Sequence, residues 1–430
     1  MAKQVDKIDI SPAAARLTTS LRDIGYDFVT AVADLVDNSI EAGATTIDIS
    51  LEFDGDDSWV RIADDGEGMR PGVLNEAMRF GTQRSYRDGE LGRFGLGLKT
   101  ASLSQCRRLI VITRAANERR RIYARAIDLD YIIRSDSWSA LEVPIRALND
   151  HLIGGLVNAP GTAVVWANLD RVFEGLRSRG GHARRRLERL ALATREHIGA
   201  VFHRFLDGEI PQRGQLKVSV NDELVEPWDP FARSERMTEA LPFREFPLEH
   251  GGRRTTVGFH PYVLPHRDGF STQRAFDRFG GPQRWNRQQG LYIYRANRLI
   301  QAGGWAGMRA IDEHTKLARA ALDFPPVLDE LFKVNVAKMK VSLPSDLKLP
   351  LERSVNELVA AAQARYRRGQ IAGRDRKGRL TTDGLPNVGE IGVAIRAAAM
   401  EAGETAALRR IEDRLRDRAS GVAAAVGWLD

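Results

Sequence analysis

Cysteine is almost absent from this sequence, since its 430 residues include one, Cys106. No disulfide can form within the chain, and zinc sites built on several cysteines are excluded. No run of about eighteen apolar residues occurs, so the sequence offers no membrane-spanning helix. The first ten residues, MAKQVDKIDI, lack the apolar core of a secretory signal. We therefore expect a cytoplasmic protein with no membrane association.

Strong charge of one sign is also missing. The formal net charge is +7, which is mild for this length and permits contact with nucleic acid without requiring it. His250, His260, His266 and His314 have no metal-ligand spacing. Hydrophobic residues make up 43% of the chain, enough for packed cores, and the length is typical of two or three domains.

The most informative stretch runs from Arg61 to Ser102. It begins with RIADDGEGM, a strand that enters a carboxylate–glycine turn, and ends with GELGRFGLGLKTAS, a glycine-rich loop that opens a helix. Glycines let backbone approach a ligand closely, and N–H groups at a helix start favour an anion. A carboxylate that accepts from a base, followed by a phosphate-holding loop, indicates a nucleotide site. Either half alone fits tight turns in an ordinary α/β domain equally well.

A helix upstream shifts that balance. Residues 26–42, YDFVTAVADLVDNSIEA, carry apolar side chains at helical spacing and are followed by Gly43, a helix-ending residue. Asp34 and Asn38 lie one turn apart and therefore share a face. An acid and an amide on one face could activate a water and bind a magnesium ion. The alternative is a solvated polar face.

The order of these motifs resembles that of the GHKL ATPases, the superfamily of gyrase B, heat-shock chaperone ATPases, histidine kinases and MutL. DLVDNSIEAGAT and LGRFGLGLKTAS are most similar to the MORC and MutL branch, over roughly residues 26–162. The resemblance implies ATP and Mg²⁺ as ligands. It implies Asp34 as general base, Asn38 as magnesium ligand and Asp64 as adenine reader. The other nucleotide-binding residues that it implies are Gly66, Gly68, Met69, Gly92, Gly95, Leu96, Gly97, Leu98, Lys99 and Thr162.

The sequence departs from the family at the base, which is usually Glu where this chain has Asp34. Asp is one methylene shorter, and a misplacement of about an ångström can cost ~10²-fold in rate. We therefore expect ATP hydrolysis to be slow.

The expected fold is α+β, a GHKL-type two-layer α/β sandwich with a mixed sheet and helices on one face. A smaller α/β transducer domain and a helical C-terminal tail follow. The strands expected in the sandwich are 45–53, 59–63, 108–115, 121–133, 141–146 and 162–169, with a helix from about 177 to 205. The expected domains are an N-terminal arm at 1–25, the ATP-binding domain at 26–206, the transducer-like domain at 207–350 and the basic helical tail at 351–430.

In the second domain we expect a hairpin at 216–225, a strand at 253–260 and a strand–turn–strand at 291–300. The segment KVNVAKMKVSL resembles a MutL transducer segment, which implies that Lys340 reaches the γ-phosphate, with Lys338 as the alternative. A lysine here also fits an edge-strand charge.

Two basic segments leave their roles open. The arginines of 177–195 fit a solvated helix face or a DNA-backbone patch, and 365–379 reads as a basic, glycine-punctuated linker that could contact phosphates. Residues 388–418 read as a helical tail. The arm at 1–25 fits either a capping helix or a segment that crosses to a partner subunit.

These features together predict an ATP-dependent molecular switch that forms a homodimer when ATP binds. The resemblance implies action on DNA or on protein partners, including those of a DNA-modification or defence system. Two alternatives remain: a chaperone-like ATPase and a nucleotide sensor that hydrolyses little. A histidine kinase would need a phospho-acceptor histidine ahead of these motifs, whereas the first histidine is His151.

Overall fold

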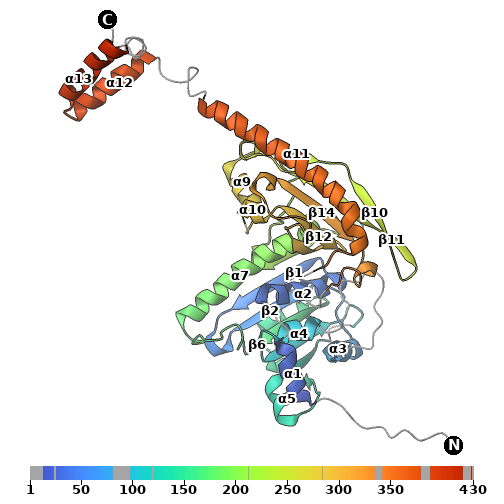
Figure 1. Cartoon of the computed structure of the whole chain (residues 1–430). Helices are drawn as coiled ribbons and strands as arrows, with labels where there is room; N and C mark the ends of the chain where they lie inside the picture. Colours follow the sequence, from blue (N-terminus) through green and yellow to red (C-terminus); the bar gives the residue numbers. More distant parts are fainter. Residues whose placement is uncertain are drawn as a thin grey trace, which may run out of the picture. The chain divides into compact units, whose positions relative to one another are not determined.

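The computed structural model describes residues 13–23, 26–80, 97–118, 121–211, 213–282, 284–334, 341–378, 388–419 and 428. The chain forms two compact units, Met1–Gln363 and Ala364–Asp430. The described residues form two sheets, and both lie in the first unit (Figure 1).

The first sheet has eight strands in the order β5-β4-β3-β6-β2-β1-β7-β8. Neighbouring strands run antiparallel except for β1 and β7, so the sheet is mixed as the sequence predicts. The strands are β1 (Thr46–Glu52), β2 (Trp59–Asp64), β3 (Arg108–Arg114), β4 (Tyr123–Asp128), β5 (Leu141–Glu142), β6 (Gly161–Ala167), β7 (Lys217–Val220) and β8 (Glu223–Leu224).

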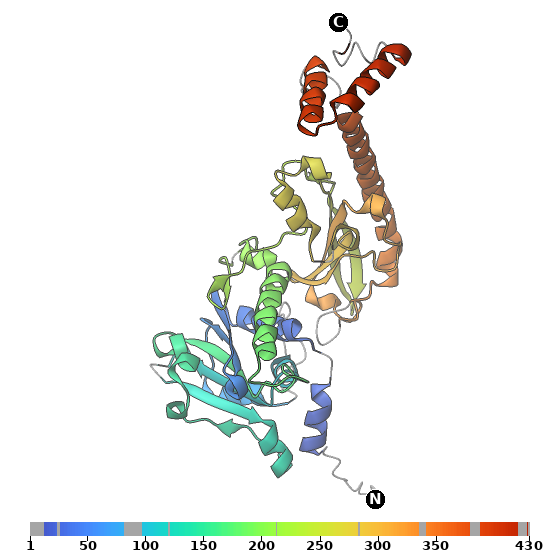
Figure 2. The same ribbon diagram turned by 90° about the vertical axis from the view of Figure 1, so that its left-hand side faces the viewer.

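Helices cover one face of this sheet and enclose the main core of the unit. Phe28 and Trp166 meet edge to face in that core, with ring centroids 5.7 Å apart. Figures 1 and 2 show the long helix α7 running along the sheet. The helices are α1 (Ala14–Arg22), α2 (Phe28–Glu41), α3 (Pro71–Met78), α4 (Gly97–Leu103), α5 (Leu129–Ser135), α7 (Gly181–Val201) and α8 (His203–Leu206). The expected two-layer α+β fold is thereby confirmed.

The opposite face carries a smaller core. Ile110, Ala163 and Val165 of the sheet pack there against Ile153 and Leu156. Those two residues belong to the short helix α6 (Asp150–Ile153) and to a 3-10 turn, Gly154–Val157.

Two expected strands are wrong in part. We predicted a strand to residue 133, but β4 ends at Asp128. The side chain of Asp128 accepts a hydrogen bond from the backbone N–H of Tyr131 and caps α5. The strand expected at 141–146 is reduced to the two residues of β5, after which Pro144 enters a 3-10 turn.

The hairpin at 216–225 forms as predicted, with Asn221 and Asp222 in the left-handed region at φ 48° and 63°. Its strands β7 and β8 join the first sheet beside β1. The first sheet therefore extends past residue 206, the expected end of the ATP-binding domain.

The second sheet has the order β10-β11-β14-β12-β13, with β9 paired to β11. Its strand–turn–strand β12–β13 is the one predicted at 291–300, and Ala296 and Asn297 make the turn at positive φ. The elements are β9 (Glu239–Ala240), β10 (Arg244–His250), β11 (Arg253–Val263), α9 (Gln273–Gly280), α10 (Arg284–Arg287), β12 (Gly290–Arg295), β13 (Arg298–Ala302) and β14 (Ala318–Phe324).

Helix α11 (Ser345–Gly378) begins in the first unit, where Glu357 pairs with Arg244 of β10 at 2.5 Å. The linker expected at 365–379 is wrong, because the helix continues to Gly378. The predicted helical tail consists of α12 (Val388–Glu401) and α13 (Thr405–Arg418), separated by Gly403 at φ 73°.

Candidate functional site

Helix α2 brings the proposed base and the proposed metal ligand together. The side chain of Asp27 accepts a hydrogen bond from the backbone N–H of Thr30 at 2.8 Å and caps the helix, which ends before Gly43 at φ 75°. Asp34 is 3% exposed, whereas Asn38, one turn later, is exposed between buried neighbours. The helix thus presents a sheltered carboxylate and an open amide on one face.

Tyr26, Arg298 and Gly97 lie close to the Asp34 carboxylate. Oδ2 accepts a hydrogen bond from the Tyr26 hydroxyl at 2.7 Å, and Oδ1 lies 3.5 Å from a guanidinium nitrogen of Arg298. Gly97, the first residue of α4, lies so close that a β-carbon there would be 3.6 Å from Oδ2. The helix start that follows the glycine-rich loop therefore abuts the proposed base.

Asp64 ends β2 and is held in place by polar contacts. Its Oδ2 accepts from the Ser39 hydroxyl at 2.8 Å and its Oδ1 from the backbone N–H of Gly66 at 3.0 Å. Burial raises the pKa of this carboxyl, and the hydrogen bonds from Ser39, Gly66 and Thr162 oppose the rise. A carboxylate so oriented, with lone pairs left over, can accept from the amino group of a base.

Sheet register places Thr162 beside Asp64. Thr162 of β6 is the direct partner of Asp64 in β2 and of Thr113 in β3. The Thr113 hydroxyl donates to the carbonyl of Gly161 at 2.9 Å and lies 3.1 Å from the Thr162 hydroxyl, and it also accepts from the backbone N–H of Met69 at 2.8 Å. The ends of three strands and the carboxylate–glycine turn thus form one polar edge.

The two glycines of the turn sit where a side chain does not fit. A β-carbon on Gly66 would lie 2.8 Å from the carbonyl oxygen of Ala42. Gly68 has φ +64°, and a β-carbon there would overlap the carbonyl oxygen of Arg114. The backbone after Asp64 is therefore packed against the end of α2 and the end of β3.

Gly68→Ala is expected to lower the free energy of unfolding by about 1–3 kcal/mol or more, because strain at positive φ adds to the overlap with Arg114. Gly72→Ala is the matched control, since a β-carbon on this helical glycine meets nothing within 4 Å. It should be neutral or slightly stabilising. Denaturant unfolding measures both, and equal effects would contradict the close approach at Gly68.

The remaining phosphate-binding candidates are only partly in view. Gly97 and Leu98 begin α4, and Lys99 is 2% exposed with its ammonium group 3.0 Å from the carbonyl of Ala77. Burial lowers the Lys99 pKa to about 8. The candidates that lie outside the described residues are Gly92, Gly95, Leu96, Lys338 and Lys340.

The residues present fit Mg²⁺ and ATP. Mg²⁺ prefers hard oxygen ligands and keeps several waters, which suits the exposed Asn38 amide beside the Asp34 carboxylate. Asn38 would hold the ion, and Asp64 with Thr162 would hold adenine.

Sequence reasoning missed four residues that contact the site: Tyr26, Ser39, Thr113 and Arg298. Ser39 follows Asn38 directly and could have been found from its place on α2. Arg298 comes from the second sheet and gave no local signal.

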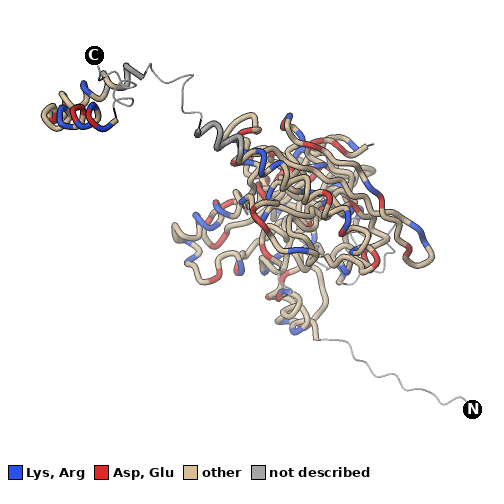
Figure 3. Tube along the Cα trace, turned by 45° about the horizontal axis from the view of Figure 1, so that its top comes forward, with Lys and Arg blue, Asp and Glu red and all other residues tan. Residues whose placement is uncertain are grey.

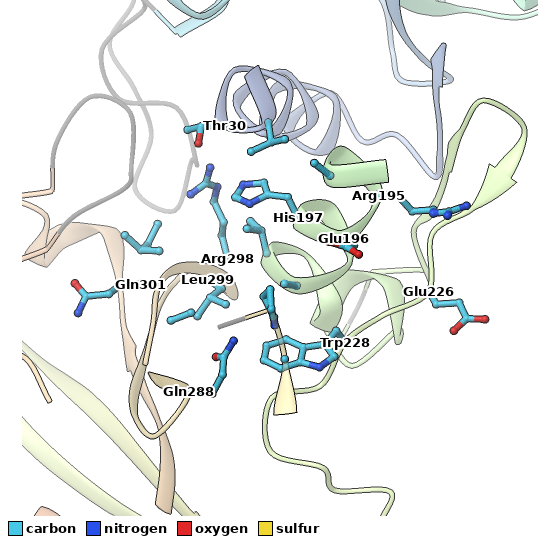
Figure 4. Close-up of a pocket in the computed structure, with 18 of the residues that line it drawn as sticks. Thr30, Arg195, Glu196, His197, Glu226, Trp228, Gln288, Arg298, Leu299 and Gln301 are labelled. Atoms are coloured by element: carbon cyan, nitrogen blue, oxygen red, sulfur yellow. The ribbon is translucent and has the colours of Figure 1, made fainter. Parts of the chain in front are cut away.

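A groove of about 1090 Å³ lies behind α2, between α7 and β13 (Figure 4). Thr30, His197, Trp228 and Gln288 line it, and Arg298 reaches it from β13. Burial and then the charge of Arg298 lower the His197 pKa to about 4, so this imidazole is neutral at physiological pH. The guanidinium that contacts Asp34 therefore also lines this groove.

Some arginines on and beside the basic helix α7 pair with acidic residues. Arg179, before the helix, pairs with Asp56 at 2.9 Å, and Arg195 pairs with Glu223. Basic and acidic residues are interspersed along the described chain (Figure 3). Among the described residues, every helix is too short or too polar to span a lipid bilayer.

Residues 26–155 match the model of the family described as histidine kinase-, DNA gyrase B-, and HSP90-like ATPase. The resemblance to the GHKL ATPases is confirmed. The matched residues include Asp34, Asn38 and Asp64 and end shortly before Thr162, so most of the geometry described above lies within the stretch that is similar to this family.

Three curated relatives are similar over part of this domain. The DNA mismatch repair protein MutL of Rhodospirillum rubrum is 39% identical over 90 residues, 20% of this chain and 14% of that protein. Protein MICRORCHIDIA 6 of Arabidopsis thaliana is 34% identical over 89 residues, 20% of this chain and 13% of that protein. ATPase MORC2B of Mus musculus is 34% identical over 92 residues, 20% of this chain and 9% of that protein. The chain therefore spans less than a sixth of each relative in these matches.

Proposed function

We propose that this protein is an ATP-binding and ATP-hydrolysing switch that dimerises when ATP binds and acts on DNA or on DNA-bound partners. The observation that carries the proposal is the convergence of Asp34, Asn38 and Asp64 on helix α2 and the adjoining strand end, inside a stretch that matches an ATPase family. This convergence supports the roles of Asp34 as base, Asn38 as metal ligand and Asp64 as adenine acceptor.

Each residue has a definite task in the proposed mechanism. Asp64 accepts from the adenine amino group, and the Thr113–Thr162 pair supports the same edge of the ring through water. Asp34 accepts a proton from the attacking water. Asn38 binds Mg²⁺, which neutralises charge on the phosphates when bound.

The Asp34 side chain favours slow turnover. It is short for a base in this family, its carboxylate accepts from Tyr26, and it lies beside Arg298. These contacts support a second candidate, a nucleotide sensor that binds ATP and hydrolyses little. Measured turnover separates the two.

Action on DNA is the least direct part of the proposal. It is supported by the name of the MutL relative, a DNA mismatch repair protein, and by the net charge of +7. The interspersed charges in Figure 3 favour a modest affinity rather than a strong one.

The test is ATP turnover per subunit over a wide range of protein concentration, with and without duplex DNA. Turnover per subunit should rise with concentration if dimerisation gates the reaction. Duplex DNA should stimulate turnover, and added salt should weaken that stimulation steeply. Tight ATP binding without turnover would favour the sensor, and turnover indifferent to DNA would favour a chaperone-like ATPase acting on proteins.

A further inference from the structure

Arg298 is a buried cation that joins the second sheet to the proposed catalytic helix. Its Nε lies 2.8 Å from Asp37, and a terminal nitrogen lies 3.5 Å from Asp34. All three side chains are 3% exposed or less. One guanidinium therefore serves two carboxylates on successive turns of α2, with Asp37 the nearer.

The position of Arg298 is set by the second sheet rather than by α2. It is the first residue of β13 and pairs with Arg295 across the tight turn at Ala296 and Asn297. Its guanidinium lies 5.7 Å from the ring centre of Phe202. Figure 4 shows its side chain extending from the hairpin past His197 toward α2. Any shift of β13 against α2 must change the distances from this guanidinium to the two carboxylates.

The physics of the triad makes it sensitive to such a shift. A buried guanidinium must keep its carboxylates, because an unpaired charge in a dry site is costly. Asp34 and Asp37 compete for the N–H donors of the one Arg298 guanidinium. When Arg298 binds Asp37 more tightly, the Asp34 carboxylate is freer to bind a water. A stronger hold on Asp34 occupies the lone pairs that would accept the proton.

We propose that Arg298 is a positioning residue that sets the availability of Asp34, with Asp37 as its competing anchor, and thereby couples the second sheet to ATP hydrolysis. This inference rests on the proposed function of Asp34 as the base. Arg298 restrains Asp34 while the pair is close, and Asp34 is released when the guanidinium moves fully to Asp37.

Three variants test the competition. Asp37→Asn removes the anchor while preserving side-chain shape, so the guanidinium closes on Asp34 and kcat should fall about tenfold, the scale of one hydrogen bond to a charged group. Adding Arg298→Gln to Asp37→Asn should restore kcat to the wild-type value or above. Arg298→Lys keeps the charge but loses the fork, so it should stay with Asp37 and raise kcat.

Two measurements separate positioning from simple loss of structure. The dissociation constant for ATP and the thermal midpoint of unfolding are measured for each variant, and ATP affinity should stay within about twofold, which corresponds to less than half a kcal/mol. The matched control is the buried pair Arg295–Asp329, at 2.7 Å on the neighbouring strand. Asp329→Asn should lower the thermal midpoint of unfolding. Adding Arg295→Gln to Asp329→Asn should not raise kcat.

The possible outcomes separate the role of Arg298 from the proposed ATP hydrolysis on which it rests. The role of Arg298 alone would be overturned by either of two results. Asp37→Asn could turn over ATP as fast as the wild type, or Asp37→Asn with Arg298→Gln could be as slow as Asp37→Asn alone. If Asp37→Asn fails to fold, Arg298→Lys decides, because a fall in its kcat at unchanged ATP affinity contradicts the restraint. Absence of wild-type turnover at every concentration would overturn the proposed hydrolysis and this inference with it.

Discussion

Asp34→Asn is expected to lower kcat for ATP hydrolysis by at least about 100-fold, the lower end of what a positioned general base contributes. Asparagine keeps the shape of the side chain and its acceptor for Tyr26, but it cannot take a proton from water. ATP affinity should change little, because the proposed adenine acceptor Asp64 and the proposed metal ligand Asn38 stay intact. Single-turnover hydrolysis and equilibrium ATP binding measure the two effects separately.

The control for this variant is Asp277→Asn, an exposed aspartate on helix α9. It should hydrolyse ATP like the wild type. Equal hydrolysis by Asp34→Asn would show that another group is the base and would remove the reason for expecting slow turnover.

The second large effect concerns nucleotide choice. Asp64→Asn should reduce the preference for ATP over GTP by at least about tenfold, on the scale of one lost hydrogen bond to a charged group. In the proposed site the carboxylate would accept from the adenine amino group and repel the guanine carbonyl, whereas an asparagine amide can donate to that carbonyl. The hydrogen bonds from Ser39 and Gly66 fix the orientation of the Asp64 carboxylate.

Asp65→Asn is the matched control within the same turn. Asp65 is exposed, and its Oδ1 accepts from the backbone N–H groups of Thr45 and Thr46, which an asparagine oxygen can also do. Competition binding with ATP and GTP should show wild-type preference for this variant. The same loss of preference in both variants would indicate a distorted turn rather than a lost adenine contact.

Local patterns in the sequence were sufficient to predict the centre of the fold. The apolar spacing of α2 and the alternation of β1 are signals carried by adjacent residues, and both elements form as predicted. The strand expected to residue 133 fails for an equally local reason, because Asp128 is an N-cap that competes with the strand pattern.

Contacts between distant segments could not be predicted in this way. Arg298 meets α2 only because a hairpin of the second sheet lies against it, and nothing in LYIYRANRLI distinguishes this arginine from Arg295. The linker expected at 365–379 is helical for another reason, since arginine, glutamine and alanine are strong helix formers that outweigh its glycines.

The most direct test of the account is calorimetric titration of ATP into the wild-type protein and into Asn38→Ala, with Mg²⁺ and with EDTA. The control is Asn356→Ala, an exposed asparagine on helix α11. The account predicts that Mg²⁺ tightens ATP binding to the wild type and to the control, and that Asn38→Ala loses ~10- to 100-fold of the Mg²⁺-dependent affinity. Magnesium-dependent binding that is the same in all three proteins would contradict the site assembled around α2.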